Sequence, residues 1–482
     1  MKRQAAVLVF ARLANYGVMM LSPLFLVRLF TVEQFGEYRE FMLYAGILQW
    51  IAGFSINDSL LYFIPLDPKR TRAWIRSSIL LVAIASLTLV VGMLGVDAVM
   101  DGDLLGWFAV PLALYLLGFA NFDFWEGWYL STGRTTAVLY YSTARLGLRM
   151  AVIVASAAIW RDVQVVVWAV AITECLRLAG SAVLWWDWDR RQQGGPGILQ
   201  SLREQWRFCT ATGTSRLVVM LNRNIGAVLI ARTLGPVELA RFTVATYPEP
   251  AISAVAKSVF TVALPELVRR RAAQGAAALE VWKRTVSWTC AGILPLLAYT
   301  LVAARDLIHV GFGEEYVSAA PLLQVFLIVT ARKCVDFTIP LQAIGETRPM
   351  LYSNVVSLAV NAAALVWLLS PYGSLGVVIA IAISTMVEPL MLGPLVSRRY
   401  QQSLQSLLHW GEVLKILLAT LATAVVAHAL RLAGLPPLGY VAISAPAAIA
   451  TCILVLLLLR SYCAQAVLRA AKNRMGGFGW QR

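Results

Sequence analysis

Residues 77–97 read SSILLVAIASLTLVVGMLGVD, a stretch that is uncharged until its last residue, Asp97. An uncharged apolar run of about 20 residues is long enough to cross the hydrocarbon core of a bilayer as one helix. Arg72 and Arg76 stand before this run, whereas residues 97–103 after it carry aspartates and no Lys or Arg. The stretch therefore predicts a membrane-spanning helix whose basic end faces the cytoplasm.

Similar apolar runs recur along the whole chain. Hydrophobic residues make up 59% of the 482 residues and charged residues only 14%, whereas soluble domains carry about 25% charged residues. This composition excludes a soluble enzyme and predicts an all-α polytopic membrane protein with about 14 transmembrane helices. The predicted spans cover about residues 8–30, 39–63, 77–97, 106–126, 135–159, 164–187, 209–232, 238–264, 286–305, 318–340, 349–369, 375–397, 412–433 and 437–460.

Lysine and arginine gather in alternate loops. They precede the first span at Lys2 and Arg3, and they follow the second, sixth, eighth and twelfth spans. The intervening loops, such as residues 97–103 and 311–316, contain neither residue type. By the positive-inside rule, both termini are cytoplasmic. The net charge of +15 is thus spread along the membrane borders and forms no single basic stripe, so we expect no nucleic-acid partner.

Two short turns that lie six spans apart resemble each other. Residues 30–38 (FTVEQFGEY) join the first two spans, and residues 234–242 (LGPVELARF) join the seventh and eighth. An even offset gives both copies the same orientation, which predicts two parallel, pseudo-symmetric six-helix lobes. We expect an N-terminal six-helix lobe at 1–190, a cytoplasmic linker at 191–208, a C-terminal six-helix lobe at 209–400, and two additional helices with a basic cytoplasmic tail at 401–482.

Charged residues inside the spans are the most informative feature for function. Each charge at bilayer depth costs roughly 2.5–3.5 kcal/mol, so these side chains should face the protein interior or a cavity. The acids at this depth, Glu174, Glu249, Asp336 and Glu388, are fewer than the bases, so we expect a water-filled cationic cavity with an anionic ligand. The basic residues within the spans are Arg12, Arg145, Arg149, Arg177, Arg216, Arg223, Lys257, Arg332 and Lys333.

Helical spacing places several of these residues on common faces. Arg216 and Arg223 are seven apart and share a face, with Asn222 and Asn224 beside the second arginine. Arginine binds phosphate oxygens through two parallel hydrogen bonds and stays charged, so these faces favour phosphate or pyrophosphate. The same spacing rule groups Arg145 with Arg149, Arg12 with Asn15 and Tyr16, and Glu249 with Ser253 and Lys257.

Structural roles compete with ligand binding at some of these positions. Glu174 and Arg177 are three residues apart and are suited to pair within one helix. Arg332 and Lys333, together with Asp336, are suited to mark the inner end of the tenth span. At these positions, charge in a span does not by itself indicate a ligand.

Motifs for ATP use and catalysis are missing. The chain has no G-x-x-x-x-G-K-[ST] loop. Its three histidines, His309, His409 and His428, lie far apart in the sequence. We therefore expect no catalytic residue, no metal site and no cofactor.

Four stretches resemble one known family. Residues 32–38 (VEQFGEY) are similar to the first outer turn of the polysaccharide flippases. These are the O-antigen and exopolysaccharide transporters of the multidrug/oligosaccharidyl-lipid/polysaccharide (MOP) superfamily. Residues 304–323 (ARDLIHVGFGEEYVSAAPLL) resemble the family's segment between spans nine and ten, and residues 345–347 (GET) its next inner turn. Asn361 and residues 372–377 (YGSLGV) resemble its eleventh and twelfth spans.

The resemblance implies a V-shaped pair of six-helix lobes around a cationic central cavity. It implies a flippase that moves an undecaprenyl-pyrophosphate-linked oligosaccharide from the cytoplasmic to the outer leaflet of the bacterial inner membrane. The family's glycine is missing from the second turn, Glu238–Phe242, and Asn222 stands where many relatives carry an acid.

On this basis we assign residues to the substrate. Pyrophosphate would bind Arg12, Arg216, Arg223 and Lys257. Cavity charge would come from Arg145, Arg149 and Arg177, and sugar hydroxyls would bind Asn15, Tyr16, Asn222 and Asn224. Expected partners are membrane lipids, the lipid-linked oligosaccharide, a polysaccharide polymerase and glycosyltransferases.

The energy source and two rival functions stay open at this point. Without an ATP motif, transport would be coupled to the membrane potential, H⁺ or Na⁺, with Glu249, Glu174 and Glu388 as candidate carriers. Glu249 has two alternative structural partners, Lys257 in its own span or an arginine across the bundle. A multidrug or cation exporter of the same superfamily would need an acidic cavity. A membrane enzyme of envelope glycan assembly would need a large outer loop or a cluster of acids and histidines.

Overall fold

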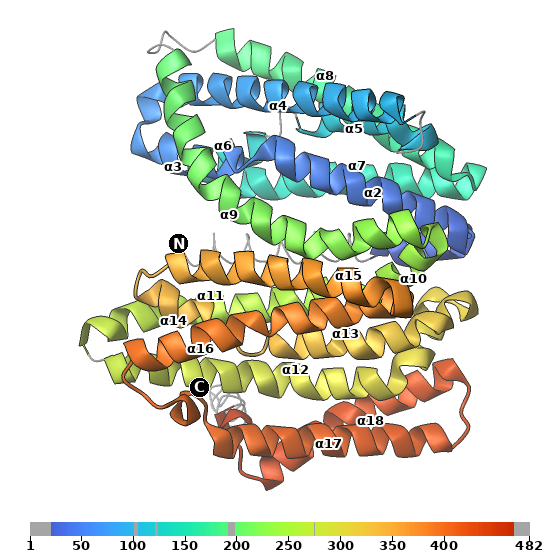
Figure 1. Ribbon diagram of the computed structural model, residues 1–482, viewed down its shortest axis with the longest axis vertical. Helices are drawn as coiled ribbons and strands as arrows, with labels where there is room; N and C mark the ends of the chain where they lie inside the picture. The colour runs from blue at the N-terminus through green and yellow to red at the C-terminus, as the bar shows by residue number, and fades with distance from the viewer. Residues whose placement is uncertain (1–20, 101–104, 121–123, 191–197, 274, 467–482) are drawn as a thin grey trace, which may run out of the picture. The chain divides into compact units, whose positions relative to one another are not determined.

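The protein is an all-α membrane protein (Figure 1). The computed structural model describes residues 21–100, 105–120, 124–190, 198–273 and 275–466. All regular secondary structure in these residues is helical, with seventeen α-helices and four short 3-10 helices. Ten helical segments of the described residues are long and apolar enough to cross a membrane, and the segment Arg348–Arg399 contains two predicted spans. The predicted class, a polytopic helical membrane protein, is confirmed.

The first of two compact units comprises residues Met1–Ala240. Residues 21–29 are helical and continue the first predicted span. The helices of this unit pack chiefly as α5 against α8, α4 against α9 and α7 against α8. Their bounds are α2 Val32–Gly53, α3 Ile56–Leu66, α4 Thr71–Val99, α5 Ala109–Ala120, α6 Phe124–Ser131, α7 Thr135–Trp160, α8 Val163–Arg190 and α9 Ile198–Thr233.

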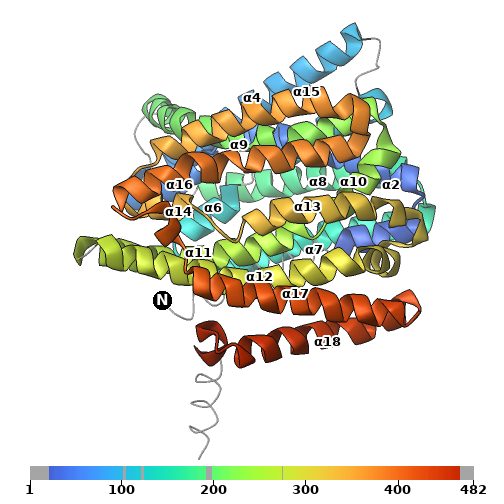
Figure 2. The same cartoon turned by 60° about the horizontal axis from the view of Figure 1, so that its bottom comes forward.

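The second compact unit comprises residues Arg241–Arg482, and α10 (Pro236–Thr246) crosses the boundary between the units. Helices α17 and α18 lie side by side along α12 in both views (Figures 1 and 2). Tyr299 of α12 and Ser444 of α18 share a buried hydrogen bond of 3.1 Å. The remaining bounds are α11 Glu249–Ala273, α12 Gly275–Phe312, α13 Ala320–Arg332, α14 Thr338–Ala343, α15 Arg348–Thr385, α16 Val387–Arg399, α17 Trp410–Leu432 and α18 Pro437–Leu458.

Several predicted spans are interrupted helices, and the interruptions recur in the same order. The predicted span 39–63 is divided into α2 and α3 at Phe54 and Ser55, which have φ of 28° and 61°. Six spans later, 238–264 is divided into α10 and α11 before Pro248. Likewise α5 is followed by the short α6, and α13 by the short α14. This repeated order of long and broken helices agrees with the predicted internal repeat.

The eleventh and twelfth predicted spans meet within α15. Gly373 has φ 54° and ψ −134°, so the helical path is interrupted there although α15 continues from Arg348 to Thr385. Glycine lacks the Cβ that makes positive φ unfavourable for other residues. The first glycine of the sequence YGSLG, Gly373, therefore stands where the chain must bend between the predicted spans 349–369 and 375–397.

The predicted linker at residues 191–208 differs from the structure. Residues 191–197 lie outside the described residues, but α9 already begins at Ile198. Gln205 is fully buried, and its amide donates to the hydroxyls of Ser78 at 2.9 Å and Ser59 at 3.1 Å. Polar residues give this segment a low hydropathy. In the structure Gln205 is nevertheless buried, because polar side chains inside the protein form hydrogen bonds to one another. Because α9 packs against α2, α3 and α4, the first compact unit extends to Ala240 and not to residue 190.

Candidate functional site

The predicted substrate face of the first span lies outside the described residues. Arg12, Asn15 and Tyr16 all belong to residues 1–20. Their assignment stays a prediction, and the site is built below from the other predicted residues.

Two arginines one helical turn apart on α7 contact different helices. Arg149 places its guanidinium 5.2 Å from the ring centre of the buried Tyr115 in α5, and its Nη2 lies 3.4 Å from the Met42 sulfur in α2. Arg145 lies 3.7 Å from the carboxylate of Glu126 in α6. Both guanidinium groups are thus held by protein groups on the inner sides of unit 1, where they contribute positive charge.

Glu174 and Arg177 form the pair within α8 that their spacing predicts. The Arg177 Nε donates to the Glu174 carboxylate at 2.7 Å, and Glu174 is 2% exposed. The Arg177 Nη2 also donates to the carbonyl oxygen of Gly118 in α5 at 2.9 Å. The arginine therefore neutralises a buried acid and fastens α8 to α5 at the same time.

Arg216 of α9 has a carboxylate partner that the sequence did not reveal. Its guanidinium pairs with Asp58 of α3, and the Arg216 side chain is 51% exposed although it is paired. Arg223 is exposed two turns further along α9, in agreement with the shared face that the seven-residue spacing predicts. Of the flanking amides, Asn224 donates to the Met220 carbonyl at 2.8 Å, and Asn222 is half-buried.

Glu249, at the start of α11, pairs with Lys333, which directly follows α13. The Lys333 ammonium binds the Glu249 carboxylate and also the hydroxyl of Ser253 at 2.7 Å. Ser253 in turn donates to Glu249 at 2.7 Å, so the three groups form a closed triangle. Lys257 lies one turn beyond Ser253 with its side chain exposed. Sequence reasoning had placed Lys333 at the end of a span, and that position is what brings it to Glu249.

The residue before Lys333 pairs with a different helix. Arg332, the last residue of α13, places its Nη2 2.5 Å from the carboxylate of Glu388 in α16. Both side chains of this pair are largely buried, with 14% of Arg332 and 22% of Glu388 exposed. Asp336 lies between α13 and α14, and its carboxylate accepts a hydrogen bond from the backbone N–H of Thr338, the first residue of α14, at 2.8 Å. Two adjacent cations at the break between α13 and α14 thus bind carboxylates of α11 and α16. We call this break, residues 332–336, the α13–α14 junction.

These pairs change the charge of the site that the sequence predicted. At least five of the cations inside the spans have a carboxylate within ion-pair distance in the described structure, namely Arg145, Arg177, Arg216, Arg332 and Lys333. Pairing lowers the cost of holding charge at this depth, and an anionic ligand would have to compete with the carboxylates. No group of three or more His, Cys, Asp and Glu side chains suited to a metal ion occurs among the residues that the structure describes.

The apolar helices, their interruptions and the paired charges within them define a multi-span helical membrane protein. Residues 1–270, more than half of the chain, match the family described as "polysaccharide biosynthesis protein". The chain belongs to this family.

Solved structures with the same fold agree with this membership. A structure titled "Lipid II flippase MurJ, inward closed conformation" is similar with a TM-score of 0.73 at 13% identity, over 95% of this chain and 100% of that one. The eukaryotic MATE transporter AtDTX14 is similar with a TM-score of 0.55 at 13% identity, over 84% of this chain and 99% of that one. An inward-facing multidrug resistance MATE transporter of the MOP superfamily gives 0.54 at 16% identity, over 83% and 96%. Among curated protein sequences, none matches this chain.

Proposed function

We propose that this protein flips an undecaprenyl-pyrophosphate-linked oligosaccharide from the cytoplasmic to the outer leaflet of the bacterial inner membrane. Membership of a polysaccharide biosynthesis family and the MurJ-like transporter fold support a flippase for cell-surface polysaccharide rather than an enzyme. Transport would proceed by alternating access through a cationic cavity. The glycosyltransferases that build the oligosaccharide and the polymerase that uses it are the expected partners.

The observation that carries the proposal is the half-exposed pair of Arg216 with Asp58 on α9 and α3. A guanidinium that is both paired and accessible can exchange one oxyanion for another with little change in its own environment. A pyrophosphate offers the same two-oxygen geometry as the carboxylate and more negative charge. We assign pyrophosphate binding to Arg216 and Arg223.

The remaining substrate residues take roles that fit their surroundings. Arg12 and Lys257 join the pyrophosphate set, and the amides of Asn222 and Asn224 are placed on α9 to bind sugar hydroxyls together with Asn15 and Tyr16. Arg145, Arg149 and Arg177 are held by protein groups, so we assign them positive potential rather than direct contact.

The membrane potential supplies a driving force that needs no ATP. A pyrophosphate diester bears about two negative charges, and each is worth about 2.3 kcal/mol per 100 mV. Because the cell exterior is positive, outward movement of the anion is favoured by about 4–5 kcal/mol at 100 mV. Coupling to H⁺ or Na⁺ would act through Glu249 first, because protonating this carboxylate removes the charge that holds Lys333 at the α13–α14 junction. Glu388 and Glu174 are the other candidate carriers.

Orientation follows from the distribution of Lys and Arg. We propose that both termini and the ends of α15 and α16 that carry Arg348, Arg398 and Arg399 are cytoplasmic. Topology reporters fused at Gly275 should then report the cytoplasm, and reporters at Glu314 the outside. The reverse pattern would invert the direction of transport proposed here.

The alternative is export of a cationic drug, because MATE transporters share this fold. A cation exporter needs an available carboxylate in its path. Glu174, Glu249 and Glu388 are each already bound to an arginine or a lysine. Such pairs disfavour binding of a second cation, and this is why we place the flippase first.

Flipping in reconstituted vesicles separates the two functions and tests the Arg216 assignment. With a fluorescent polyprenyl-pyrophosphate oligosaccharide, we expect Arg216→Ala or Arg223→Ala to lower the flipping rate at least about ten-fold, the value of one charge-assisted hydrogen bond. Arg216→Lys should recover part of the rate. Asp58→Asn should strengthen substrate binding, because it removes the competing anion. The matched control is Arg269→Ala, since Arg269 is also exposed and paired with a carboxylate, on α11.

Three results would contradict the proposal. Wild-type flipping by both alanine variants removes α9 from the binding site. Equal losses from Asp58→Asn and Arg216→Ala show that the pair is only structural. Transport of a cationic dye, without flipping of the lipid, would establish the exporter instead.

A further inference from the structure

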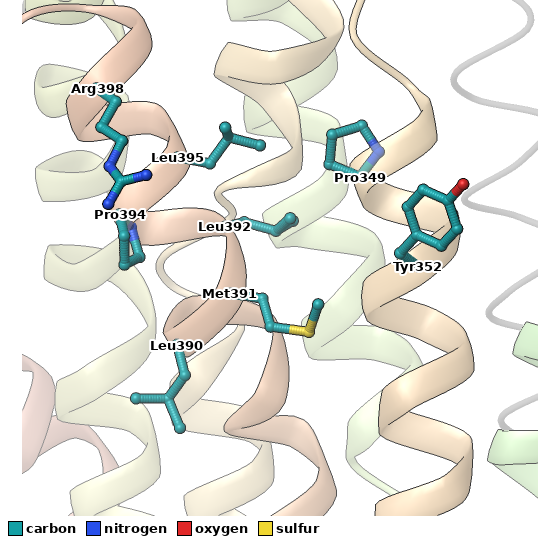
Figure 3. Close-up of a pocket in the computed structure, with 8 residues that line it drawn as sticks. All are labelled: Pro349, Tyr352, Leu390, Met391, Leu392, Pro394, Leu395 and Arg398. Carbon is teal, nitrogen blue, oxygen red and sulfur yellow. The ribbon is translucent and has the colours of Figure 1, made fainter.

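A groove on unit 2 is lined by residues that neither the predicted substrate site nor the ion pairs use. It has a volume of about 350 Å³ and lies between the first turns of α15 and the length of α16. Pro349 and Tyr352 of α15 form one wall (Figure 3). The opposite wall is formed by Leu390, Met391, Leu392, Pro394, Leu395 and Arg398 of α16.

The groove is apolar along its length and has one charge at its end. Met391 and Leu395 extend from α16 toward Tyr352 and Pro349, and the Arg398 guanidinium lies along α16 above Pro394 (Figure 3). Eight residues separate Leu390 from Arg398, which corresponds to about 12 Å along a helix. The shape is therefore that of a slot long enough for part of a hydrocarbon chain, with a guanidinium at one end.

The walls face away from the packed interior of unit 2. Leu390 is 74% exposed and Tyr352 is 63% exposed. In a protein that crosses a membrane, such apolar exposed side chains contact lipid. Arg398 is at the helix end that also carries Arg399, so the charged end of the groove lies where apolar helices meet the polar border of the bilayer.

Arg398 and Arg399 differ in what they bind. The Arg399 Nε lies 2.8 Å from the carboxylate of Glu346. The Arg398 side chain makes no hydrogen bond or ion pair with another residue in the described part of the chain, and it lines the groove. Its guanidinium thus retains its donors for an anion at the level of the lipid headgroups.

We propose that this groove binds an anionic glycerophospholipid of the bilayer, with the phosphate on Arg398 and one acyl chain along Tyr352, Leu390, Met391 and Leu395. Arginine suits a phosphate, and basic pockets at the cytoplasmic ends of helices select anionic headgroups. The volume is near the lower limit for ligand pockets, and the apolar walls suit one acyl chain better than the hydroxyl groups of an oligosaccharide. The inference rests on the proposed orientation of the chain but not on its transported substrate.

Native mass spectrometry of the purified full-length protein tests the binding directly. Delipidated protein is titrated with dioleoyl phosphatidylglycerol or dioleoyl phosphatidylcholine, and the affinity of the tightest bound lipid is measured. We expect phosphatidylglycerol to bind the wild type more tightly than phosphatidylcholine. Arg398→Gln should weaken phosphatidylglycerol about five-fold, the value of one basic residue near the membrane surface. Arg399→Gln is the matched control, because this neighbour is paired and does not line the groove.

A second variant tests the apolar part of the site. Leu390→Trp places a larger side chain in the slot at an exposed position that folding tolerates, and it should weaken binding of both lipids. Val366→Trp, at another exposed position of α15, should leave binding unchanged.

Three outcomes would overturn the proposal. Equal affinity for the two lipids would show that the headgroup charge does not determine binding. Equal losses of affinity in Arg398→Gln and Arg399→Gln would show that only the general positive charge of this surface matters. Displacement of phosphatidylglycerol by undecaprenyl phosphate at lower concentration assigns the groove to the transported lipid instead. Because the readout is binding and not flipping, a failure here leaves the proposed flippase function standing.

Discussion

The two units place ion pairs at corresponding points of the repeated helix order but build them differently. In unit 1, Glu174 and Arg177 belong to one helix, α8, and the arginine also donates to a carbonyl of α5. In unit 2, the cations stand at the end of α13 and their carboxylates come from two other helices, Glu388 of α16 and Glu249 of α11.

An ion pair within one helix is kept when that helix moves, whereas an ion pair between two helices breaks when they move apart. Two residues three apart on one helix stay together whatever that helix does. A pair between helices is lost when the helices separate, and each partner is then left without its counter-charge. The α13–α14 junction is therefore one place in the described structure where protonation or substrate would alter helix contacts, as it would at the pair of Arg216 with Asp58 in unit 1. This favours Glu249 and Glu388 over Glu174 as coupling residues.

The largest effect on stability is expected at the α13–α14 junction. Glu388→Gln leaves the guanidinium of Arg332 largely buried without a carboxylate, and we expect a loss of about 3–5 kcal/mol in the free energy of unfolding. Arg332→Met combined with Glu388→Leu removes both charges and should cost far less. Denaturant unfolding in detergent measures both variants. A double variant as unstable as the single one would show that packing, and not charge, holds the junction.

The two repeated turns offer the next comparison. A Cβ built on Gly36 would lie 2.0 Å from the carbonyl oxygen of Pro236, whereas the corresponding position in the second turn is the buried Ala240. Gly36→Ala forces backbone apart, so we expect a loss of about 1–3 kcal/mol. Ala240→Gly only removes a methyl group and should cost about 1 kcal/mol. Thermal unfolding of the two variants decides the order, and a tolerated Gly36→Ala would refute the close contact.

A smaller effect is expected for the pair within α8. Glu174→Gln keeps an oxygen beside Arg177, and the guanidinium retains its hydrogen bond to the Gly118 carbonyl. We expect a loss of about 1–2 kcal/mol, typical of one weakened hydrogen bond to a charged group. Measured beside Glu388→Gln, this variant sharpens the contrast between the units. If Glu174→Gln proved the more damaging, the distinction between pairs within and between helices would fail.

The smallest effect is expected at a pair on the surface of unit 2. Arg284 and Glu280 lie four apart on α12 at 2.9 Å, and the Arg284 side chain is 66% exposed. Arg284→Ala should change the free energy of unfolding by about 0.3–0.5 kcal/mol, and salt should reduce even that difference. Glu280 also binds His409 at 3.0 Å, so a loss above about 1 kcal/mol would indicate that the three groups act as one network.

Much of the fold was predictable because hydropathy is a local property. Thirteen of the predicted spans, from 39–63 onward, coincide with helices or pairs of broken helices in the described structure, and the first continues into residues 21–29. The local nature of hydropathy also explains why residues 198–208, predicted as part of a linker, are helical in the structure. A polar stretch reads as a linker, but both Gln205 and Ser201 are buried there: Gln205 donates to Ser59 of α3 and Ser78 of α4, and Ser201 accepts from Arg70, directly before α4.

The site was predictable in its residue types but not in its contacts. Charge within apolar spans identified Glu249, Glu388, Arg216 and Lys333 as residues that must face protein or a cavity. Spacing found only the partner that lies within one helix, Arg177 for Glu174. It missed Asp58 as the partner of Arg216 because the two residues are far apart in the chain.

The sequence by itself determined that the chain is a helical membrane protein, where it spans, which residues carry charge into the membrane and which family it resembles. Each of these depends on composition or spacing within a few turns of one helix. Only the tertiary structure decided that Lys333, which is far from Glu249 in the chain, binds it. That choice depends on where α13 ends and which helices pack beside its end, and no single segment of the sequence contains this information.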